Sequence, residues 1–230
     1  MGVETVVVAM DGPSGSGKSS TSRGVAARLG LRYLDTGAMF RAITWWLLQR
    51  GVDVEDAAAV AALADAPVLV SGTDPAAPSI TVDGVDVAGP IRSAQVTGAV
   101  SAVSAVPEIR ARLLREQRDI IGAGGIVVEG RDIGTVVAPD AAVKVYLTAD
   151  PGARAARRTA ELTGTTVEAT HADLARRDRL DSGRVTAPLA MADDAHHIDT
   201  TPFTLEEVVD QVVRLVEERA DGEGRLAERR

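Results

Sequence analysis

The sequence predicts an α/β fold in which helices cover a doubly wound parallel sheet that carries a small β-rich insertion. Three observations lead to this prediction: short apolar runs rich in valine, helical segments between them, and a glycine-rich turn after the first run. Short, continuous apolar runs are typical of strands buried on both faces of a parallel sheet. Their regular alternation with helices indicates the doubly wound arrangement.

The length and composition fit one large domain with insertions. The chain has 230 residues, of which 45% are hydrophobic and 25% charged, so it can bury a sizeable core. Its net charge of −8 at pH 7 gives no general attraction for nucleic acid or anionic lipid. An anionic ligand must therefore be bound by local groups.

The sequence also favours a cytoplasmic protein. It contains no cysteine, which excludes disulfides and thiolate metal sites. It has no span of about 20 apolar residues and no basic amino-terminal region. We therefore expect a soluble protein with no membrane partner.

The amino-terminal elements begin with a buried strand and a helix. The apolar run Val3–Met10 predicts the strand, and helical spacing over Gly17–Leu29 predicts the helix, which Gly30 ends. The elements expected next are a strand at Leu31–Leu34 and helices at Ala38–Gln49 and Ala57–Ala64.

A β-rich insertion follows at Pro67–Gly89. Its strand candidates are Pro67–Ser71, Ser79–Val82 and Val85–Val87. Asp83-Gly84 between the last two is a typical hairpin turn.

The second half returns to alternating helices and buried strands. Pro107 stands at a helix start, where its missing N–H costs nothing. The predicted helices are Ser93–Val106, Pro107–Ile121, the arginine-rich pair Ala153–Leu162 and His171–Leu180, and Leu205–Glu218. The predicted strands are Ile126–Glu129, Val143–Leu147 and a short one at Ile198, and the polar end from Asp221 is expected to be frayed.

The glycine-rich turn is a phosphate-binding motif. Gly12-Pro13-Ser14-Gly15-Ser16-Gly17-Lys18-Ser19 fits G-x-x-x-x-G-K-[ST] and lies between a buried strand and a helix, as its mechanism requires. Backbone N–H groups and the helix dipole would hold the phosphates, with Lys18 on the β and γ groups and the Ser19 hydroxyl on Mg²⁺. A nucleoside triphosphate is the expected ligand of this P-loop.

A P-loop alone leaves switches, motors and small-molecule kinases open. The chain has no Asn-Lys-x-Asp segment to read guanine, which disfavours a switch. No apolar strand ends in the Asp-Glu pair with which hydrolysing ATPases position water, which disfavours a motor. Three separate arginine and acid clusters occur instead: Asp35 to Arg41, Gly130-Arg131-Asp132, and Arg177 with Asp181 and Arg184. One cluster alone would be a solvated ion pair, but three on loops of a P-loop fold favour binding of a second phosphate.

These residues give the chain a resemblance to bacterial cytidylate kinases, P-loop kinases of nucleoside monophosphates. The resemblance runs nearly end to end. It rests on the P-loop from Asp11 to Lys18, on Leu34 to Arg41, on Gly89-Pro90-Ile91-Arg92, on Val128-Glu129-Gly130-Arg131-Asp132-Ile133-Gly134-Thr135-Val136-Val137, and on Arg177-Asp178 with Asp181, Arg184, Ala187, Pro188 and Leu189. Many relatives have Gly where this chain has Ser19 and Ser where it has Thr36, and neither departure removes the chemistry.

The resemblance implies transfer of a phosphoryl group from ATP, with Mg²⁺, to CMP and dCMP. It also implies that the enzyme is a monomer with no nucleic acid partner. The implied catalytic residues are Lys18, Arg131, Asp132, Arg177 and Arg184. The implied ATP-binding residues are the P-loop residues Gly12 to Ser19, Ser20, and the lid arginines Arg157 and Arg158, with Ser19 on the metal. The implied CMP-binding residues are Asp35, Thr36, Arg41, Ser101, Arg110, Arg131, Asp132, Arg177, Asp181 and Arg184.

The resemblance also implies an organisation of the chain. A kinase domain would occupy residues 1–221, with a core of 1–36, 90–150 and 185–220. The monophosphate-binding region would cover about 37–106 with the insertion at 67–89, the lid about 153–184, and a disordered polar tail 222–230.

Two other classes of function stay open on the residues alone. A kinase for UMP or a sugar would use the same P-loop, and a regulatory or RNA-binding module would bind ATP without turnover. His196-His197 beside Asp193 and Asp194 favours no metal site, since adjacent residues on a strand point to opposite faces. Trp45-Trp46 reads as a packing anchor with a rim contact.

Overall fold

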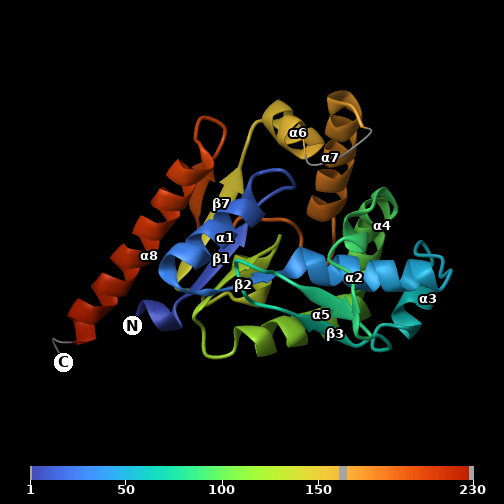
Figure 1. Cartoon of the computed structure of the whole chain (residues 1–230), viewed down its shortest axis with the longest axis horizontal. Coiled ribbons are helices and arrows are strands. Elements are labelled where there is room, and N and C mark those ends of the chain that lie inside the picture. Colours follow the sequence, from blue (N-terminus) through green and yellow to red (C-terminus); the bar gives the residue numbers. More distant parts are fainter. Residues whose placement is uncertain (1, 161–164, 228–230) are drawn as a thin grey trace. The chain divides into compact units, whose positions relative to one another are not determined.

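The computed structural model describes residues 2–160 and 165–227. The chain divides into two compact units (Figure 1). The first combines Met1–Tyr33 with Ala123–Arg230, and the second is Leu34–Gly122. The finer boundaries of core, lid and monophosphate-binding region stay predictions.

A five-stranded sheet forms the centre of the first unit, in the order β2-β6-β1-β7-β8. β1 pairs in parallel with β6 and β7, and β7 pairs in parallel with β8. The strands are β1 (Val7–Asp11), β2 (Arg32–Asp35, where the first unit passes into the second), β6 (Ile126–Glu129), β7 (Val143–Thr148) and β8 (His196–Asp199). The predicted doubly wound fold class is confirmed.

Helices α1 (Lys18–Leu29) and α8 (Leu205–Ala227) pack together against this sheet (Figure 1). The buried cluster beneath them includes Val8 and Met10 of β1, Val25 of α1 and Val212 of α8. The two helices approach closely at Gly24, where an added Cβ would lie 2.7 Å from a methyl of Val209. Valine-rich strands and the absence of a side chain at Gly24 therefore bring the P-loop helix onto the core.

The first unit also carries the pair α6 (Pro151–Ala160) and α7 (Val167–Ser182), which pack against each other (Figure 1). A short 3-10 turn, Val3–Thr5, precedes β1. A π-helical segment, Ile133–Val137, follows β6. Residues 161–164, which belong to the predicted lid, lie outside the described part of the chain.

The second unit contains α2 (Thr36–Gln49), α3 (Ala57–Ala62), the short helix Pro90–Arg92, α4 (Ala94–Ala105) and α5 (Pro107–Ile121). It also holds an antiparallel sheet of β3 (Leu69–Ser71), β4 (Ile80–Val82) and β5 (Val85–Asp86). Asp83 and Gly84 have φ values of 51° and 79°, as a tight hairpin turn requires. The predicted β insertion is therefore present, and Trp46 anchors it by donating to Asp83 over 2.6 Å.

Four sequence expectations were wrong in detail. β1 begins at Val7, because Val3–Thr5 turns back on itself through the bond from Thr5 N to Gly2 O. α2 begins at Thr36 because Asp35 is its cap and accepts from Ala38 N over 2.9 Å. α7 begins at Val167 because Thr166 caps it.

The fourth difference concerns the carboxyl-terminal tail. α8 continues to Ala227, beyond the predicted helix end at Glu218, and residues 228–230 lie outside the described residues. The disordered tail at 222–230 stays a prediction. Within the described part of the chain, no helix is long and apolar enough to cross a membrane.

Candidate functional site

The P-loop connects β1 to α1 with three glycines in the left-handed region. Gly12, Gly15 and Gly17 have φ values of 142°, 79° and 89°. A Cβ at Gly12 would lie 2.1 Å from the carbonyl oxygen of Leu147, so the loop also passes against β7. Backbone geometry therefore requires glycine here, and the loop keeps the conformation in which its N–H groups can receive phosphates.

Lys18 is the first residue of α1, and its ammonium group closes the loop. The Nζ atom donates to the carbonyl oxygen of Pro13 over 2.7 Å, and the side chain is 6% exposed. A buried cation held by the loop itself is pre-positioned for the phosphates that the loop would bind.

Ser19 is bonded to a buried carboxylate that sequence reasoning did not single out. Its Oγ donates to Oε2 of Glu129 over 2.9 Å, while the hydroxyl of Tyr33 donates to Oε1. Because the Ser19 hydroxyl donates its hydrogen bond to a carboxylate, the lone pairs of Oγ can point toward a cation. Hydroxyl and carboxylate oxygens are the ligands that Mg²⁺ prefers, so Ser19 and Glu129 fit the expected metal.

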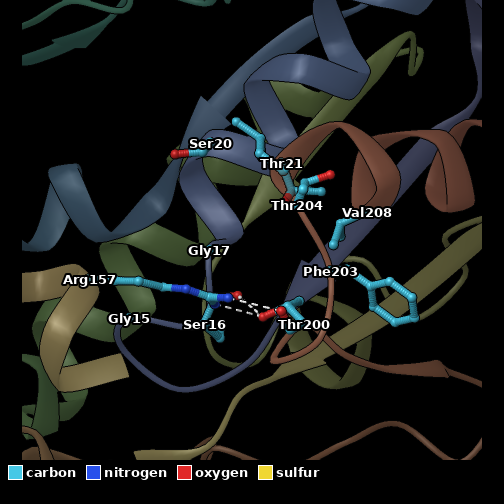
Figure 2. Close-up of a pocket in the computed structure, with 11 residues that line it drawn as sticks. Gly15, Ser16, Gly17, Ser20, Thr21, Arg157, Thr200, Phe203, Thr204 and Val208 are labelled. Carbon is cyan, nitrogen blue, oxygen red and sulfur yellow. Dashed lines mark hydrogen bonds between the residues drawn. The ribbon is translucent and has the colours of Figure 1, made fainter. Parts of the chain in front are cut away.

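A cavity of about 270 Å³ lies beside the P-loop (Figure 2). Its lining comes from the P-loop and α1, from α6, and from the segment after β8 with the start of α8: Gly15, Ser16, Gly17, Ser20, Thr21, Arg157, Thr200, Phe203, Thr204, Leu205 and Val208. Figure 2 shows the Arg157 guanidinium directed at Thr200, where Nη1 meets Oγ1 and Nη2 meets the carbonyl oxygen, each at 2.8 Å. The predicted residues Ser20 and Arg157 therefore border one cavity.

The cavity residues from Thr200 to Val208 were missed by sequence reasoning. They follow the short strand β8, which the sequence marked only by Ile198. Thr200 also donates from Oγ1 to the carbonyl oxygen of Ser16 over 3.1 Å. No residue pattern in this segment marks it as a binding loop, and only its packing on the P-loop reveals it.

Arg154 joins the P-loop to both arginine-rich helices. Its Nη1 donates to the carbonyl oxygen of Ser14 over 3.1 Å and to Oδ2 of Asp178 over 2.6 Å. Arg154 thus ties α6 to the loop and to α7. Arg158, predicted beside Arg157, is not among the described residues that line the cavity.

The predicted residues Arg131, Arg177, Asp181 and Arg184 come together at the end of α7. Arg131 Nε donates to Asp181 Oδ2 over 3.0 Å, and Arg184 Nε donates to the Asp181 carbonyl oxygen over 3.2 Å. The buried Arg177 brings a further positive charge into this cluster, close enough to Arg131 for the two guanidinium groups to repel each other. Arg131 and Arg184 contact Asp181, and both Asp181 and Asp173 act on Arg177, so the positive charge of the three guanidinium groups is offset only in part.

Arg177 is the most confined of these arginines. It is 3% exposed, and in the described part of the chain its Nε and Nη1 atoms have no hydrogen-bond partner. Burial, followed by repulsion from Arg131, lowers the pKa of Arg177 to about 10. A buried donor without an acceptor is costly, so the arrangement suits an oxyanion.

Asp132 is 5% exposed and stands between Arg131 and the π-helical segment. The carboxylate of Asp11 accepts from the next two backbone N–H groups, those of Ile133 at 2.8 Å and Gly134 at 2.7 Å. Burial raises the pKa of Asp11 to about 6, although the two hydrogen bonds act in the opposite direction and lower it. Asp11 precedes the P-loop glycines, and its sequence position alone does not mark it as a site residue.

In the second unit, α4 is the meeting point of the predicted residues. Arg41 Nη1 donates to Thr97 Oγ1 over 3.4 Å, and Arg110 Nη1 donates to the Ser104 carbonyl oxygen over 3.2 Å. Ser101 lies on the same helix and is 6% exposed. The guanidinium of Arg110 also lies 5.4 Å from the centre of the Phe40 ring.

The remaining predicted residues of this unit stand at the start of α2. Asp35 is occupied as the helix cap, and Thr36 is buried at the first helical position.

The histidine pair and the tryptophan pair, to which the sequence assigns no ligand, have local partners in the structure. Nε2 of His197 lies 2.8 Å from Thr148 Oγ1, across the β7–β8 pair. In residues 2–160 and 165–227, no three His, Cys, Asp or Glu residues gather as a metal cluster. Trp46 is 5% exposed, and Arg50 stacks 3.6 Å from its ring centre.

Comparison with known proteins identifies one family. The model of the family described as cytidylate kinase matches residues 8–218. A cytidylate kinase of Streptomyces griseus is 62% identical to the chain, over 93% of this chain and 93% of its own length. A cytidylate kinase of Streptomyces avermitilis is 59% identical, over 94% of this chain and 95% of its own length.

Solved structures agree with the fold. A gluconokinase from Sinorhizobium meliloti superimposes with a TM-score of 0.51 and 13% identity, covering 95% of each chain. At this identity the likeness concerns the fold alone.

Proposed function

The chain belongs to the cytidylate kinase family, and we propose that it transfers the γ-phosphoryl group of ATP, with Mg²⁺, to CMP and dCMP. The products are ADP and CDP or dCDP. Apart from family membership, one structural observation supports the proposal most directly. The unit that holds the P-loop also holds Arg177, a buried guanidinium beside Arg131 whose Nε and Nη1 find no partner among the described residues.

The donor half of the proposal concerns ATP. The N–H groups of Gly12 to Lys18 and the Lys18 ammonium would hold its phosphates, and the cavity beside the loop would take its nucleoside. Arg157 borders that cavity, and with Arg158 it would cover the phosphates from the lid. Ser19, oriented by Glu129, would bind Mg²⁺, which when bound neutralises charge on the phosphates.

The acceptor half concerns the nucleoside monophosphate. Arg41, Arg110 and Arg131 would hold its phosphate, because guanidinium groups bind phosphate oxygens in pairs of hydrogen bonds. Asp181 would accept from the sugar hydroxyls. Arg177 and Arg184 would contact the phosphate and the group in transfer.

The preference for cytosine would come from Asp132, with Ser101 and Arg110. The exocyclic amine of cytosine donates a hydrogen bond that a carboxylate accepts. Uracil carries a carbonyl oxygen at that place, which a carboxylate repels. The burial of Asp132, which is 5% exposed, strengthens this repulsion.

The chemistry needs positioning and cations, with no general base. The attacking phosphate oxygen of CMP is already an anion, and the transition state spreads charge over the moving group. Lys18, Arg177 and Arg184 are therefore proposed to stabilise that charge. Closure over the substrates would exclude water and limit hydrolysis of ATP.

The decisive experiment measures ADP release from ATP with each of CMP, dCMP, UMP, AMP and GMP, with Mg²⁺ present or removed by chelation. Turnover should be confined to cytidine nucleotides, should need the metal, and should be lost in Lys18→Ala. Asp132→Ala should accept UMP more readily. Equal turnover of UMP by the wild type would refute the cytosine preference, and no turnover with any monophosphate would leave only an ATP-binding protein.

Arg115→Ala is a suitable control in the same assay. Arg115 is an exposed arginine of α5 whose ion pair with Asp65 is 3.7 Å long. Its removal takes one positive charge from the chain, as Lys18→Ala does, but should leave turnover unchanged.

We also propose that the protein acts in the cytoplasm as a monomer on small-molecule substrates, without a nucleic acid partner. The acidic net charge of −8 supports the last point. Sedimentation of the purified chain tests the oligomeric state.

A further inference from the structure

The segment Arg131–Asp132 is held at both ends by the residues that lead into the P-loop. Before it, Gly130 N donates to the carbonyl oxygen of Met10 over 3.0 Å. After it, the N–H groups of Ile133 and Gly134 donate to the two carboxylate oxygens of Asp11. Two residues of β1 thus bracket the two residues that are proposed to meet the acceptor.

The second end of this bracket is made by a side chain. The carboxylate of Asp11 supplies one oxygen to each N–H, Oδ1 to Ile133 at 2.8 Å and Oδ2 to Gly134 at 2.7 Å. An asparagine of the same shape has one acceptor oxygen and would turn an NH₂ group toward one of these donors. Only a carboxylate satisfies both N–H groups at this position.

The packing around Asp11 leaves the bracket little freedom. Asp11 is 5% exposed. A Cβ added to Gly134 would lie 3.4 Å from Asp11 Oδ2 and 3.2 Å from Cδ of Lys144, so glycine lets the carboxylate and the lysine stem approach the backbone. A shift of the carboxylate would therefore be passed to the backbone next to Asp132.

We propose that Asp11 is a positioning residue for acceptor recognition, which fixes the backbone of Arg131 and Asp132 relative to the P-loop through its bonds to Ile133 and Gly134. The inference rests on the proposed roles of Arg131 and Asp132 in binding CMP. It gives the residue before the P-loop a role in choosing the acceptor, in addition to its place in β1.

The test compares CMP with UMP in Asp11→Asn. Loss of one charge-assisted bond should raise the KM for CMP about tenfold and reduce the preference for CMP over UMP by a similar factor. The KM for ATP should change by less than about threefold, since the P-loop keeps its own contacts. A residue that only stabilised the fold would lower turnover of CMP and UMP by one common factor, and an unchanged preference would overturn the proposal.

Asp56→Asn is the matched control. Asp56 also accepts two consecutive backbone N–H groups, those of Ala58 and Ala59 at 3.0 and 3.1 Å, but it is exposed at the start of α3. Asn caps a helix as well as Asp, so the preference should stay at the wild-type value.

Asp132→Ala separates this inference from the proposed function. If Asp132→Ala keeps the full preference for CMP, the role of Asp132 fails and the inference falls with it. If Asp132→Ala loses the preference while Asp11→Asn keeps it, Asp11 alone is refuted.

A measurement on the wild type guards against a variant that does not fold. The amide protons of Ile133 and Gly134 should shift together in NMR spectra as Asp11 titrates, with a midpoint near its pKa of about 6. The charged and titratable groups that face Asp11 are Lys18, Asp132, Tyr146 and Lys144. Amide shifts of Ile133 and Gly134 that stay constant while the carboxyl carbon of Asp11 itself titrates would show that the two bonds are absent in solution and would overturn the proposal.

Discussion

The Nε atom of Arg131 donates to Oδ2 of Asp181 over 3.0 Å and so joins the loop after β6 to the last turn of α7. The pair is mostly buried, with side chains that are 19% and 8% exposed. Arg184 bonds the carbonyl oxygen of the same aspartate. Asp181 therefore holds together arginines that would otherwise repel one another.

Asp181→Asn removes this counter-charge and should lower the free energy of unfolding by about 2 kcal/mol, because the arginines stay partly buried without it. Urea denaturation measures this loss. Inorganic phosphate should raise the Tm of the variant more than that of the wild type, since a bound anion replaces the missing charge. An equal rise in both proteins would contradict the assigned role of Asp181.

Arg177→Met should have the opposite effect on stability. The change removes a buried cation whose Nε and Nη1 have no partner within residues 2–160 and 165–227, so the free energy of unfolding should stay equal or rise by about 1 kcal/mol. The KM for CMP should rise at least tenfold, since about two charge-assisted bonds to the acceptor would be lost. Denaturation and ADP release measure the two effects separately.

The exposed Arg115 provides the comparison for this variant. Arg115→Met should change neither stability nor KM, because its side chain is 67% exposed. If Arg177→Met were instead destabilised by more than about 2 kcal/mol, the guanidinium would be a structural group and not a receptor for an anion.

The P-loop and the β insertion could be predicted because each has a local cause. Gly12, Gly15 and Gly17 adopt positive φ values that few other residues tolerate, and Asp83-Gly84 forms a turn that its residue types favour. Alternating strands and helices then specify the fold class. Such signals need no knowledge of distant parts of the chain.

The parts that could not be predicted depend on contacts distant in sequence. Asp11 bonds N–H groups 122 and 123 positions away, and Ser19 bonds a carboxylate 110 positions away. The cavity wall from Thr200 to Val208 is recognisable only from its packing on the P-loop. The cap at Asp35 shows a smaller difficulty, since Asp35 and Thr36 both suit a cap and the backbone decides between them.

Asp83→Ala tests how the β insertion is held to α2. Asp83 has φ of 51° and accepts from Trp46 Nε1 over 2.6 Å and from Val68 N over 2.8 Å. Alanine loses both bonds and is strained at positive φ, so the Tm should fall by about 4 °C or more and the emission of Trp46 should change. Asp83→Asn keeps an acceptor and tolerates this φ, and it should lose less.

The pH dependence of this contact follows from the same bonds. Donation by Val68 N, and then by Trp46, lowers the pKa of Asp83 below its ordinary value of 3.8. A carboxyl with a lowered folded pKa stabilises the protein above its unfolded pKa, and this contribution is lost as the pH falls through the folded value. The gap in Tm between the wild type and Asp83→Ala should therefore narrow below about pH 4, and a constant gap would contradict the assignment.

The pKa of Asp11 is shifted in the opposite direction to that of Asp83, because burial raises it from 3.8 to about 6. Between these values the unfolded chain has released the proton that the folded chain still holds, so rising pH lowers the free energy of unfolding. The full pKa shift lowers the free energy of unfolding by about 3 kcal/mol, and this loss is complete above about pH 6. Asp11→Asn has no such titration.

Urea denaturation of the ligand-free wild type and of Asp11→Asn should therefore show the variant gaining stability relative to the wild type from about pH 4 to pH 7, by up to about 3 kcal/mol. A difference that stays constant over this range would mean that Asp11 is ionised throughout. A gain in stability that accompanies a loss of the preference for CMP would identify the buried carboxylate as a group that costs stability and serves recognition, because the two bonds that hold Ile133 and Gly134 require its charged form.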